Sequence, residues 1–126
     1  MSAKYLLAVG AGSFVGGVAR YLVSLAIRPG AITHFPWNTF IVNIAGCFLI
    51  GIAFGFFERG TTSHGWRLFI TTGLLGGFTT FSAFSIETVN LFKEKHTTAA
   101  ILYVSLSVVI GLLVTLIAYN ISKKVI

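Results

Sequence analysis

Four long apolar stretches make up most of this chain and limit what it can fold into. They run over residues 5–27, 37–57, 68–92 and 98–121. Each reaches or approaches the ~20 residues that a helix needs to cross a bilayer. Only 10% of the residues are charged, whereas a soluble domain carries about 25%. The sequence therefore predicts an all-α membrane protein with four transmembrane helices, in a single domain that covers residues 1–126.

The first apolar stretch has one alternative interpretation, as a secretory signal peptide with Lys4 as its charged start. A signal peptide is not favoured, because this stretch is long, rich in glycine and contains Arg20. It also has no clear small-residue cleavage site. We therefore interpret residues 5–27 as a transmembrane helix.

Cysteine and histidine chemistry is limited in this sequence. Cys47 is the only cysteine, so no intrachain disulfide can form. The three histidines, His34, His64 and His96, fall in or beside three different connections between the apolar stretches. We interpret them as solvated loop residues, since that spacing does not favour a shared metal site.

The basic residues point to the membrane surface rather than to nucleic acid. A formal net charge of +6 would indicate nucleic acid as a partner of a soluble protein. Here the basic side chains are spread over the short connections and the two ends. Contact with anionic lipid headgroups explains that distribution more simply.

The distribution of basic residues between the two sides of the membrane is nearly even. With four spans, one side holds five of them: Lys4, Arg59, Arg67, Lys123 and Lys124. The other side holds three, or four if Arg20 reaches it: Arg28, Lys93 and Lys95. A bias this small is a weak topological signal. It is compatible with insertion both ways round and with an antiparallel, dual-topology homodimer whose two-fold axis lies in the membrane plane.

The third apolar stretch carries its poorest helix-forming sequence, GGFTTFSAFS at 76–85, near its centre. Glycine costs ~1 kcal/mol relative to alanine inside a helix. We expect a break at 76–80, near the bilayer centre, where freed carbonyls must be covered by protein, water or an ion. Carbonyl oxygens suit a hard cation such as sodium, and two antiparallel chains would double their number. A kink that serves only packing is the alternative.

Phenylalanines and hydroxyls alternate after the predicted break. Phe81 and Phe84 share a helix face, and the electropositive edges of their rings can face a small anion. Ser82 lies between the two phenylalanines, and Glu87 and Thr88 follow them in the same segment. Core or lipid contact is the simpler interpretation of two phenylalanines, but a wall of rings interleaved with hydroxyls is less typical of lipid-facing sequence.

Two other stretches contribute polar residues at membrane depth. Asn43, with Thr39 one turn before it, lies in the second stretch, and an unpaired buried amide costs several kcal/mol. Tyr103, Ser107, Gly111 and Thr115 recur every fourth residue in the fourth stretch. Interhelical hydrogen bonding would explain this stripe, at about 0.6 kcal/mol per pair. Together with the ring edges, these groups also form a row of donors that can replace the hydration shell of a small anion.

Arg20 is the only basic residue within the first apolar stretch, close to its end. It can extend to the interface along its aliphatic stem. The alternative is a functional role, in which it raises the anion concentration in an aqueous vestibule.

The chain resembles the small bacterial fluoride channels of the Fluc/CrcB family. The similarity covers essentially the whole chain and is carried by GGVAR at 16–20, TFIVNIAG at 39–46 and GLLGGFTTFSAFSIET at 73–88. This resemblance implies a dual-topology homodimer in the bacterial inner membrane, with two fluoride pores and a structural sodium ion between the subunits.

The resemblance also implies roles for particular residues. The backbone carbonyls of Gly76 and Thr79 would bind sodium. Phe81 and Phe84 would line the pores, and Asn43 would donate to fluoride. The polar track would include or adjoin Thr39, Ser82, Glu87, Tyr103, Ser107 and Thr115. Gly111 stands where some members of the family carry serine, and Thr115, one turn further, can take over there.

The expected activity is passive, selective export of fluoride rather than an enzymatic reaction. Hydrogen fluoride enters as a neutral acid and dissociates inside, and a negative-inside potential drives the anion out. One alternative is a small proton-coupled multidrug exporter, which needs a substrate-exposed carboxylate in the membrane interior. The other is a non-transporting membrane assembly subunit, in which the break would serve packing alone.

Overall fold

The computed structural model describes residues 2–27 and 34–125, and every regular element in them is helical. Helix α1 spans Ala3–Ala26, α2 spans Trp37–Phe57 and α6 spans Thr97–Val125. The third segment is composite: α3 (His64–Arg67), the π-helix η1 (Leu68–Leu75), α4 (Gly76–Phe78) and α5 (Phe81–Lys93). Arg28, which we assigned to the side with fewer charges, lies outside the described residues.

Four segments are long and apolar enough to cross a membrane. They are Ala3–Ala26, Trp37–Phe57, His64–Lys93 and Thr97–Lys124. The prediction of an all-helical protein with four membrane-spanning segments is therefore confirmed, and each predicted stretch coincides with one of these segments.

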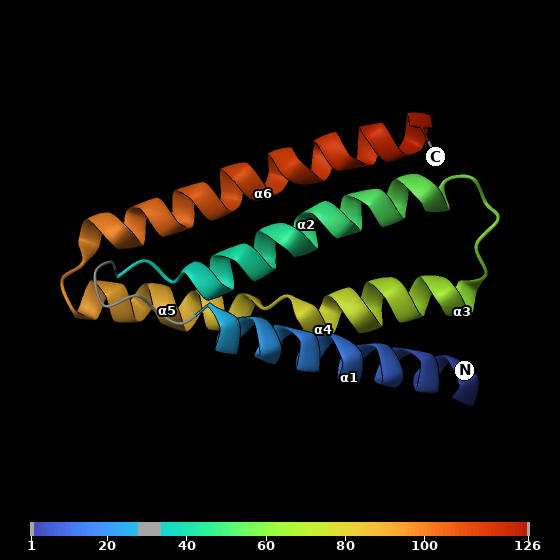
Figure 1. The fold of residues 1–126 in the computed structure, drawn as a ribbon, viewed down its shortest axis with the longest axis horizontal. Coiled ribbons are helices and arrows are strands. Elements are labelled where there is room, and N and C mark those ends of the chain that lie inside the picture. The colour runs from blue at the N-terminus through green and yellow to red at the C-terminus, as the bar shows by residue number, and fades with distance from the viewer. Residues whose placement is uncertain (1, 28–33, 126) are drawn as a thin grey trace.

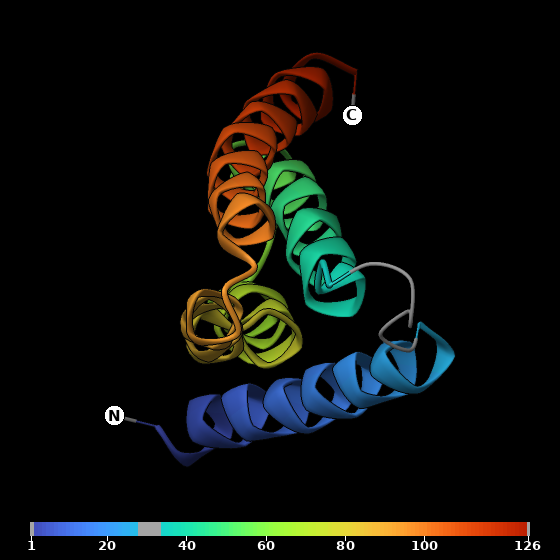
Figure 2. The ribbon, with the colours of Figure 1, turned by 90° about the vertical axis from the view of Figure 1, so that its left-hand side faces the viewer.

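The helices pack mainly as two pairs. Helix α2 runs along α6, and α1 packs against η1 and α4 (Figures 1 and 2). Helix α5 packs against the first part of α6. A cluster of buried side chains, Leu91, Ala100 and Tyr103, holds this last contact together, with Phe84 and Phe35 packed against it.

Glycines allow the backbones in each pair to approach closely. A Cβ atom at Gly12 would lie 2.5 Å from the carbonyl oxygen of Phe69, across the α1–η1 contact. A Cβ atom at Gly51 would lie 2.5 Å from the carbonyl oxygen of Thr115, across the α2–α6 contact. Packing between membrane helices depends on such small residues. Gly16 and Gly55, each four residues further along its helix, contact the same neighbouring helices.

Two extended residues separate α4 from α5. Thr79 has φ −93° and ψ 158°, and Thr80 has φ −151° and ψ 122°. The Thr80 hydroxyl then caps α5 by accepting a hydrogen bond from the Ala83 N–H at 3.1 Å. Threonine is a favoured residue at a helix N-cap, so the TT pair both ends one helix and starts the next.

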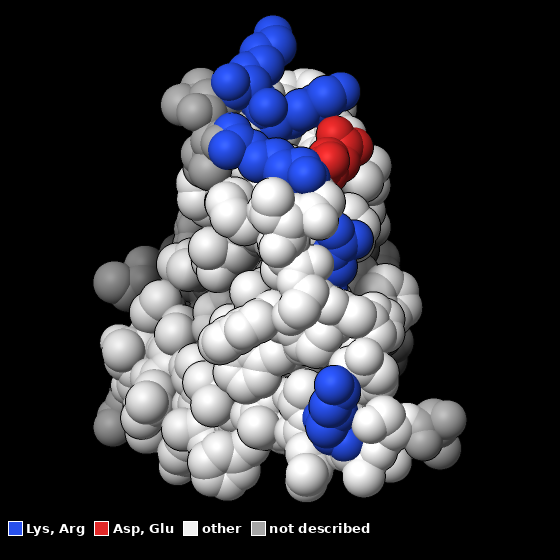
Figure 3. Space-filling view, turned by 90° about the vertical axis from the view of Figure 1, so that its right-hand side faces the viewer, with Lys and Arg blue, Asp and Glu red and all other residues white. Residues whose placement is uncertain are grey.

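Five of the nine basic residues lie at one end of the molecule. Helix α1 begins there, α2 ends there, α3 begins there and α6 ends there (Figure 1). These elements and the turn after α2 bring together Lys4, Arg59, Arg67, Lys123 and Lys124, with Glu58 as the acidic residue (Figure 3). The N-terminus, second connection and C-terminus thus share one side, as the sequence predicts.

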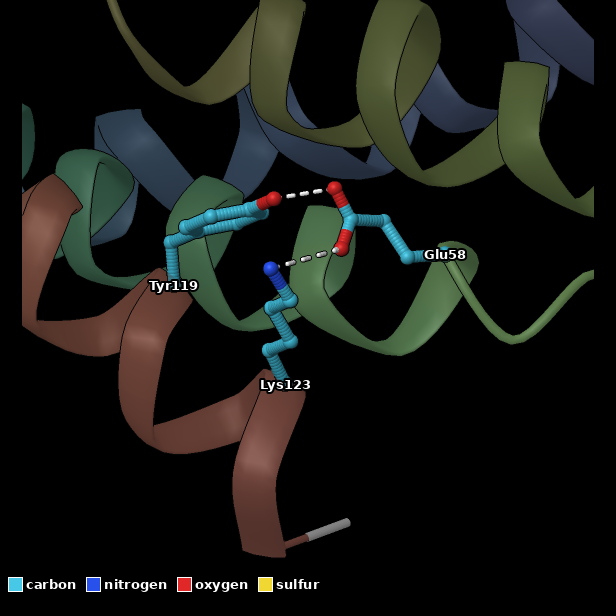
Figure 4. A network of polar contacts seen from close by, with 3 residues as sticks. All are labelled: Glu58, Tyr119 and Lys123. Atoms are coloured by element: carbon cyan, nitrogen blue, oxygen red, sulfur yellow. Dashed lines mark hydrogen bonds and ion pairs between the residues drawn. The ribbon is translucent and has the colours of Figure 1, made fainter.

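A small polar network joins the ends of α2 and α6 on that side. The Tyr119 hydroxyl donates a hydrogen bond to Glu58 Oε1, and Lys123 Nζ lies 3.9 Å from Glu58 Oε2 (Figure 4). All three groups face solvent, where such ion pairs contribute about 0–1 kcal/mol. This network therefore aligns the helix ends more than it stabilises the fold.

At the opposite end, two of the loop histidines meet. The rings of His34 and His96 stack with centroids 3.5 Å apart and planes 12° apart. Next to His34, the Phe35 ring packs edge-on against Tyr103 at 5.4 Å. Sequence reasoning treated these histidines as separate, because they lie in different connections. Their contact joins the segment before α2 to the α5–α6 turn.

Candidate functional site

Asn43, on α2, binds the backbone of Thr80 at two points. Its Nδ2 donates to the Thr80 carbonyl at 3.2 Å, and its Oδ1 accepts from the Thr80 N–H at 3.1 Å. An extended residue inside a membrane segment exposes backbone groups that lipid cannot satisfy. The Asn43 amide covers both of these groups. At least part of the hydrogen-bonding capacity of Asn43 is therefore satisfied by protein.

Two carbonyls around the extended residues lose their helical partners. In an unbroken helix, the carbonyl of Gly76 would accept from the N–H of Thr80, four residues later. That N–H donates to Asn43 instead. Likewise, the N–H of Ala83, which would pair with the Thr79 carbonyl, donates to the Thr80 hydroxyl. The carbonyls of Gly76 and Thr79 are thus released from the helical hydrogen-bond pattern.

The Gly77 carbonyl, which lies between these two, has a side-chain donor. Arg20 Nε, on α1, donates to the Gly77 carbonyl at 3.3 Å. Positive charge near the C-terminal end of a helix is favourable, because the last carbonyls there carry partial negative charge. Arg20 thus reaches the end of α4 and lines a cavity of about 200 Å³ that also includes Thr39, Thr80 and Glu87. Arg20 therefore lies at a polar cavity within the fold, and its role in a vestibule stays a prediction.

A carboxylate lies where three helices meet. Glu87, on α5, accepts hydrogen bonds from the Thr39 hydroxyl of α2 and the Tyr103 hydroxyl of α6, both at 2.9 Å. Tyr103 is fully buried and Thr39 is 7% exposed. Three of the predicted polar residues therefore form one hydrogen-bonded cluster, one donor to each carboxylate oxygen. The same cavity that holds Arg20 reaches this cluster.

The two phenylalanines have different surroundings. Their ring centroids lie 5.6 Å apart, and the Phe84 ring lies 4.9 Å from that of Tyr103. Phe84 therefore joins the buried aromatic cluster, whereas Phe81 is 78% exposed. Ser82, also exposed, has its hydroxyl 3.1 Å from that of Thr80. Phe81 and Ser82 thus project from the face at which the third segment is interrupted.

The predicted stripe on α6 divides into two parts. Ser107 is half-buried one turn beyond Tyr103. Thr115 lies twelve residues beyond Tyr103, about 18 Å along the helix axis, and donates to the carbonyls of Cys47 and Gly111 at 3.1 and 2.9 Å. The bond to Cys47 joins α6 to α2, and the bond to Gly111 lies within α6. Thr115 is therefore not brought to the Glu87 cluster.

Gly111 is in tight contact with α2. A Cβ atom there would lie 3.2 Å from Cys47 Sγ, which is closer than most Cβ contacts. A serine at this position would press on Cys47. Some members of the family carry serine at this position. In this chain the glycine allows α6 to pack closely on α2.

Thr80 and Gly46 were not singled out from the sequence. Thr80 binds Asn43, caps α5 and neighbours Ser82, and a hydroxyl residue just before a helix start is the signal that points to such a cap. Gly46 lies against the Thr79 side chain, where a Cβ atom would collide with the threonine methyl group. Both residues line an open cavity of about 360 Å³ with Asn43, Gly76, Thr79 and Phe81.

Taken together, the fold and this site define a class: a small polytopic membrane protein whose buried polar groups surround an interrupted membrane segment. A family model described as "CrcB-like protein, Camphor Resistance (CrcB)" matches residues 7–119. The chain belongs to this family.

Curated relatives are similar over nearly the whole length. The "Fluoride-specific ion channel FluC" of Flavobacterium psychrophilum is 44% identical over 98% of this chain and 99% of its own. That of Desulfotalea psychrophila is 44% identical over 94% and 92%. "Fluoride-specific ion channel FluC 1" of Yersinia pestis is 45% identical over 90% of each chain.

Proposed function

We propose that this protein is a fluoride-selective ion channel of the bacterial inner membrane, through which fluoride leaves the cytoplasm passively. The observation that carries the proposal is the row of polar groups at membrane depth. It runs from Asn43 and Thr80 to the Thr39–Glu87–Tyr103 cluster, beside Phe81 and Phe84. Membership in the family and the names of its curated relatives support the choice of fluoride.

Selectivity for a small anion follows from the kind of donors that line this path. Amide and hydroxyl groups donate hydrogen bonds without a fixed positive charge. A donor that the protein does not already use, such as the second amide N–H of Asn43, can therefore replace hydration water without trapping the ion. The electropositive edges of Phe81 and Phe84 add weak attraction. Arg20, at one end of the path, attracts anions into the vestibule.

The functional unit in this proposal is an antiparallel homodimer with two pores. Support comes from the near-even distribution of basic residues, which permits both orientations. It also comes from Phe81, which is 78% exposed in the single chain beside the interruption near the centre of the third segment. In an antiparallel pair, this ring would meet the partner and line a pore made by both subunits.

A structural sodium ion on the two-fold axis is the second part of the proposal. The carbonyls of Gly76 and Thr79 fit a hard cation, since their helical N–H partners are bound by Asn43 and by the Thr80 hydroxyl. Two such chains would present four carbonyl oxygens to one ion. Sodium would supply positive charge that holds the two interrupted segments together.

The proton-coupled exporter is less well supported by this geometry. Glu87 is the acidic residue within the spans, and Thr39 and Tyr103 already donate to its two oxygens. A coupling carboxylate must instead exchange between protons and substrate. Glu58 and Glu94 lie at the ends of helices α2 and α5, away from the membrane interior.

Flux from proteoliposomes loaded with fluoride or chloride tests the proposal. We expect fluoride efflux driven by the membrane potential and chloride efflux lower by at least about 100-fold. Phe81→Ile, which removes the ring edge, should reduce fluoride efflux at least about tenfold. Phe14→Ile is a matched control, since Phe14 is 74% exposed on α1. Equal fluoride and chloride efflux, or none of either, would refute the proposed function.

A further inference from the structure

A third cavity, of about 380 Å³, opens at the basic end of the molecule. It lies between the start of α1, which contributes Lys4, Tyr5 and Ala8, and the α3–η1 junction, which contributes His64, Trp66 and Phe69. None of its lining residues belongs to the cavities around Thr80. The ion path therefore does not account for it.

The lining of this cavity changes from polar to apolar along the membrane normal. Lys4, Ser63 and His64 lie at the helix ends. Ala8 and Phe69 lie one helical turn, about 5.4 Å, deeper than Lys4 and Gly65. An opening that is polar at the interface and apolar one turn below it matches the shape of a lipid, with its headgroup above its acyl chains.

Aromatic rings form the walls. The Tyr5 and His64 rings meet edge to face with centroids 4.8 Å apart. The Trp66 ring lies 5.6 Å from Phe69 and is itself 61% exposed. Tryptophan and tyrosine favour the headgroup level of a bilayer. Their presence around one opening indicates a site at that level.

The charge of the lining favours an anionic occupant. Lys4 Nζ lies 5.2 Å from the Tyr5 ring centroid, so the ammonium group is beside the cavity wall. The lining contains no carboxylate, and the nearby acid of this end, Glu58, contacts Tyr119 and Lys123 instead (Figure 4). Figure 3 shows the basic groups on this face, most of them together at one edge and one apart from the others. A cation that no lining acid neutralises complements a headgroup with net negative charge.

We propose that this cavity is a binding site for one anionic phospholipid. The headgroup phosphate contacts the Lys4 ammonium and the His64 ring N–H. One acyl chain runs past Trp66 along Ala8 and Phe69. This site is independent of the ion path, and it gives each chain a preference for anionic lipid at the end where its N- and C-termini lie.

Quenching of Trp66 fluorescence by brominated lipids tests the site. The sequence has two tryptophans, so Trp37→Phe leaves Trp66 as the only emitter. If this variant does not assemble, the difference between the wild type and Trp66→Phe reports the same residue. We expect brominated phosphatidylglycerol to reach half-maximal quenching at about fivefold lower mole fraction than brominated phosphatidylcholine, for one lysine at the surface.

Two lysine variants identify the charge responsible. Lys4→Gln should abolish the preference for phosphatidylglycerol. Lys124→Gln, at the same end of the molecule but outside the cavity lining, should keep it. Ala8→Leu, which fills the apolar part, should weaken quenching by both lipids at low mole fraction. Equal effects of the two lysine variants would overturn the proposal, since they would indicate general surface charge.

The remaining outcomes are equally decisive. Inorganic phosphate at millimolar concentration should not relieve quenching, and relief would show a site for free phosphate instead of lipid. Trp66 that neither lipid quenches would show that a second copy of the chain covers the cavity, which also contradicts the proposal. Because fluorescence is the measurement, a protein that conducts no fluoride would leave this result unaffected.

Discussion

At the scale of a single residue, Asn43 has two effects on the backbone of the third segment. It satisfies both backbone groups of Thr80, and in doing so it releases the Gly76 carbonyl from the helical pattern. One side chain thus stabilises the interruption and determines which oxygens face the cavity. A substitution at Asn43 must therefore be designed to separate folding from ion conduction.

Asn43→Asp makes that separation. An aspartate can still accept from the Thr80 N–H, but it cannot donate to the Thr80 carbonyl when ionised, and it adds negative charge beside the anion path. We expect fluoride efflux to fall at least about tenfold while the protein still elutes as an assembled species. Asn120→Asp, on the exposed end of α6, is the matched control. Wild-type efflux from Asn43→Asp would contradict a role for Asn43 in conduction.

Tyr103 allows a similarly clean change. Tyr103→Phe removes the hydrogen bond to Glu87 but keeps the ring that packs on Phe84 and Phe35. The loss should cost about 0.5–1.5 kcal/mol of stability and lower fluoride efflux by severalfold, because Glu87 loses one of its two hydroxyl donors. Tyr119→Phe removes the other tyrosine hydroxyl of α6, which binds Glu58. Thermal unfolding in detergent measures the stability, and fluoride efflux from proteoliposomes measures conduction. Equal efflux from Tyr103→Phe and Tyr119→Phe would show that the Glu87 cluster has a structural role only.

At the scale of the elements, the α2–α6 and α1–η1 contacts hold the molecule together through close backbone approach. Hydrophobic burial contributes little between helices in lipid, so packing distance matters more there. The helices can therefore present polar groups inward only where small residues bring them near enough. Close backbone contact at Gly51 holds α2 against α6, and close contact at Gly12 holds α1 against the third segment.

Gly51→Ala tests this packing. The new methyl group would meet the Thr115 carbonyl at 2.5 Å, so α2 and α6 must separate, at a cost of about 1–3 kcal/mol. Gly10→Ala is the control, because a Cβ atom there meets no atom within 4 Å. We expect a lower unfolding temperature in detergent for Gly51→Ala and no decrease for Gly10→Ala. Similar behaviour of the two would show that the α2–α6 contact tolerates expansion.

At the scale of the whole molecule, the distribution of charge bears on the antiparallel assembly proposed above. One end carries Lys4, Arg59, Arg67, Lys123 and Lys124, and the opposite end carries Lys93 and Lys95 among the described residues. Orientation depends on this balance. An antiparallel dimer needs both orientations, so a strong bias in either direction should remove the partner that each chain requires.

Two biased variants test the antiparallel assembly. Lys93→Gln with Lys95→Gln increases the bias. Glu94→Lys combined with Arg59→Gln, Lys123→Gln and Lys124→Gln reverses it. We expect a C-terminal tag to be accessible from one side only in each variant, and fluoride efflux to be low for each alone and recovered on co-expression. Full efflux from either variant alone would contradict an antiparallel requirement.

The number and positions of the membrane spans were predictable from the sequence, because hydropathy and length are local properties that a bilayer enforces. The sequence also predicted an interruption within 76–80, since glycines and threonines are poor helix formers. It did not reveal Thr80 as the residue that binds Asn43 and caps α5. That role depends on the position of α2 relative to the third segment.

The sequence by itself therefore determined the class of fold, the membrane setting and the family. The tertiary structure alone decided which polar residues meet. Glu87 joins Thr39 and Tyr103, residues 48 and 16 positions away, whereas Thr115, on the same stripe as Tyr103, packs against Cys47. Helical spacing places residues on a face, but only the packing of one helix on another determines which face meets which, and hence which donors can line one path.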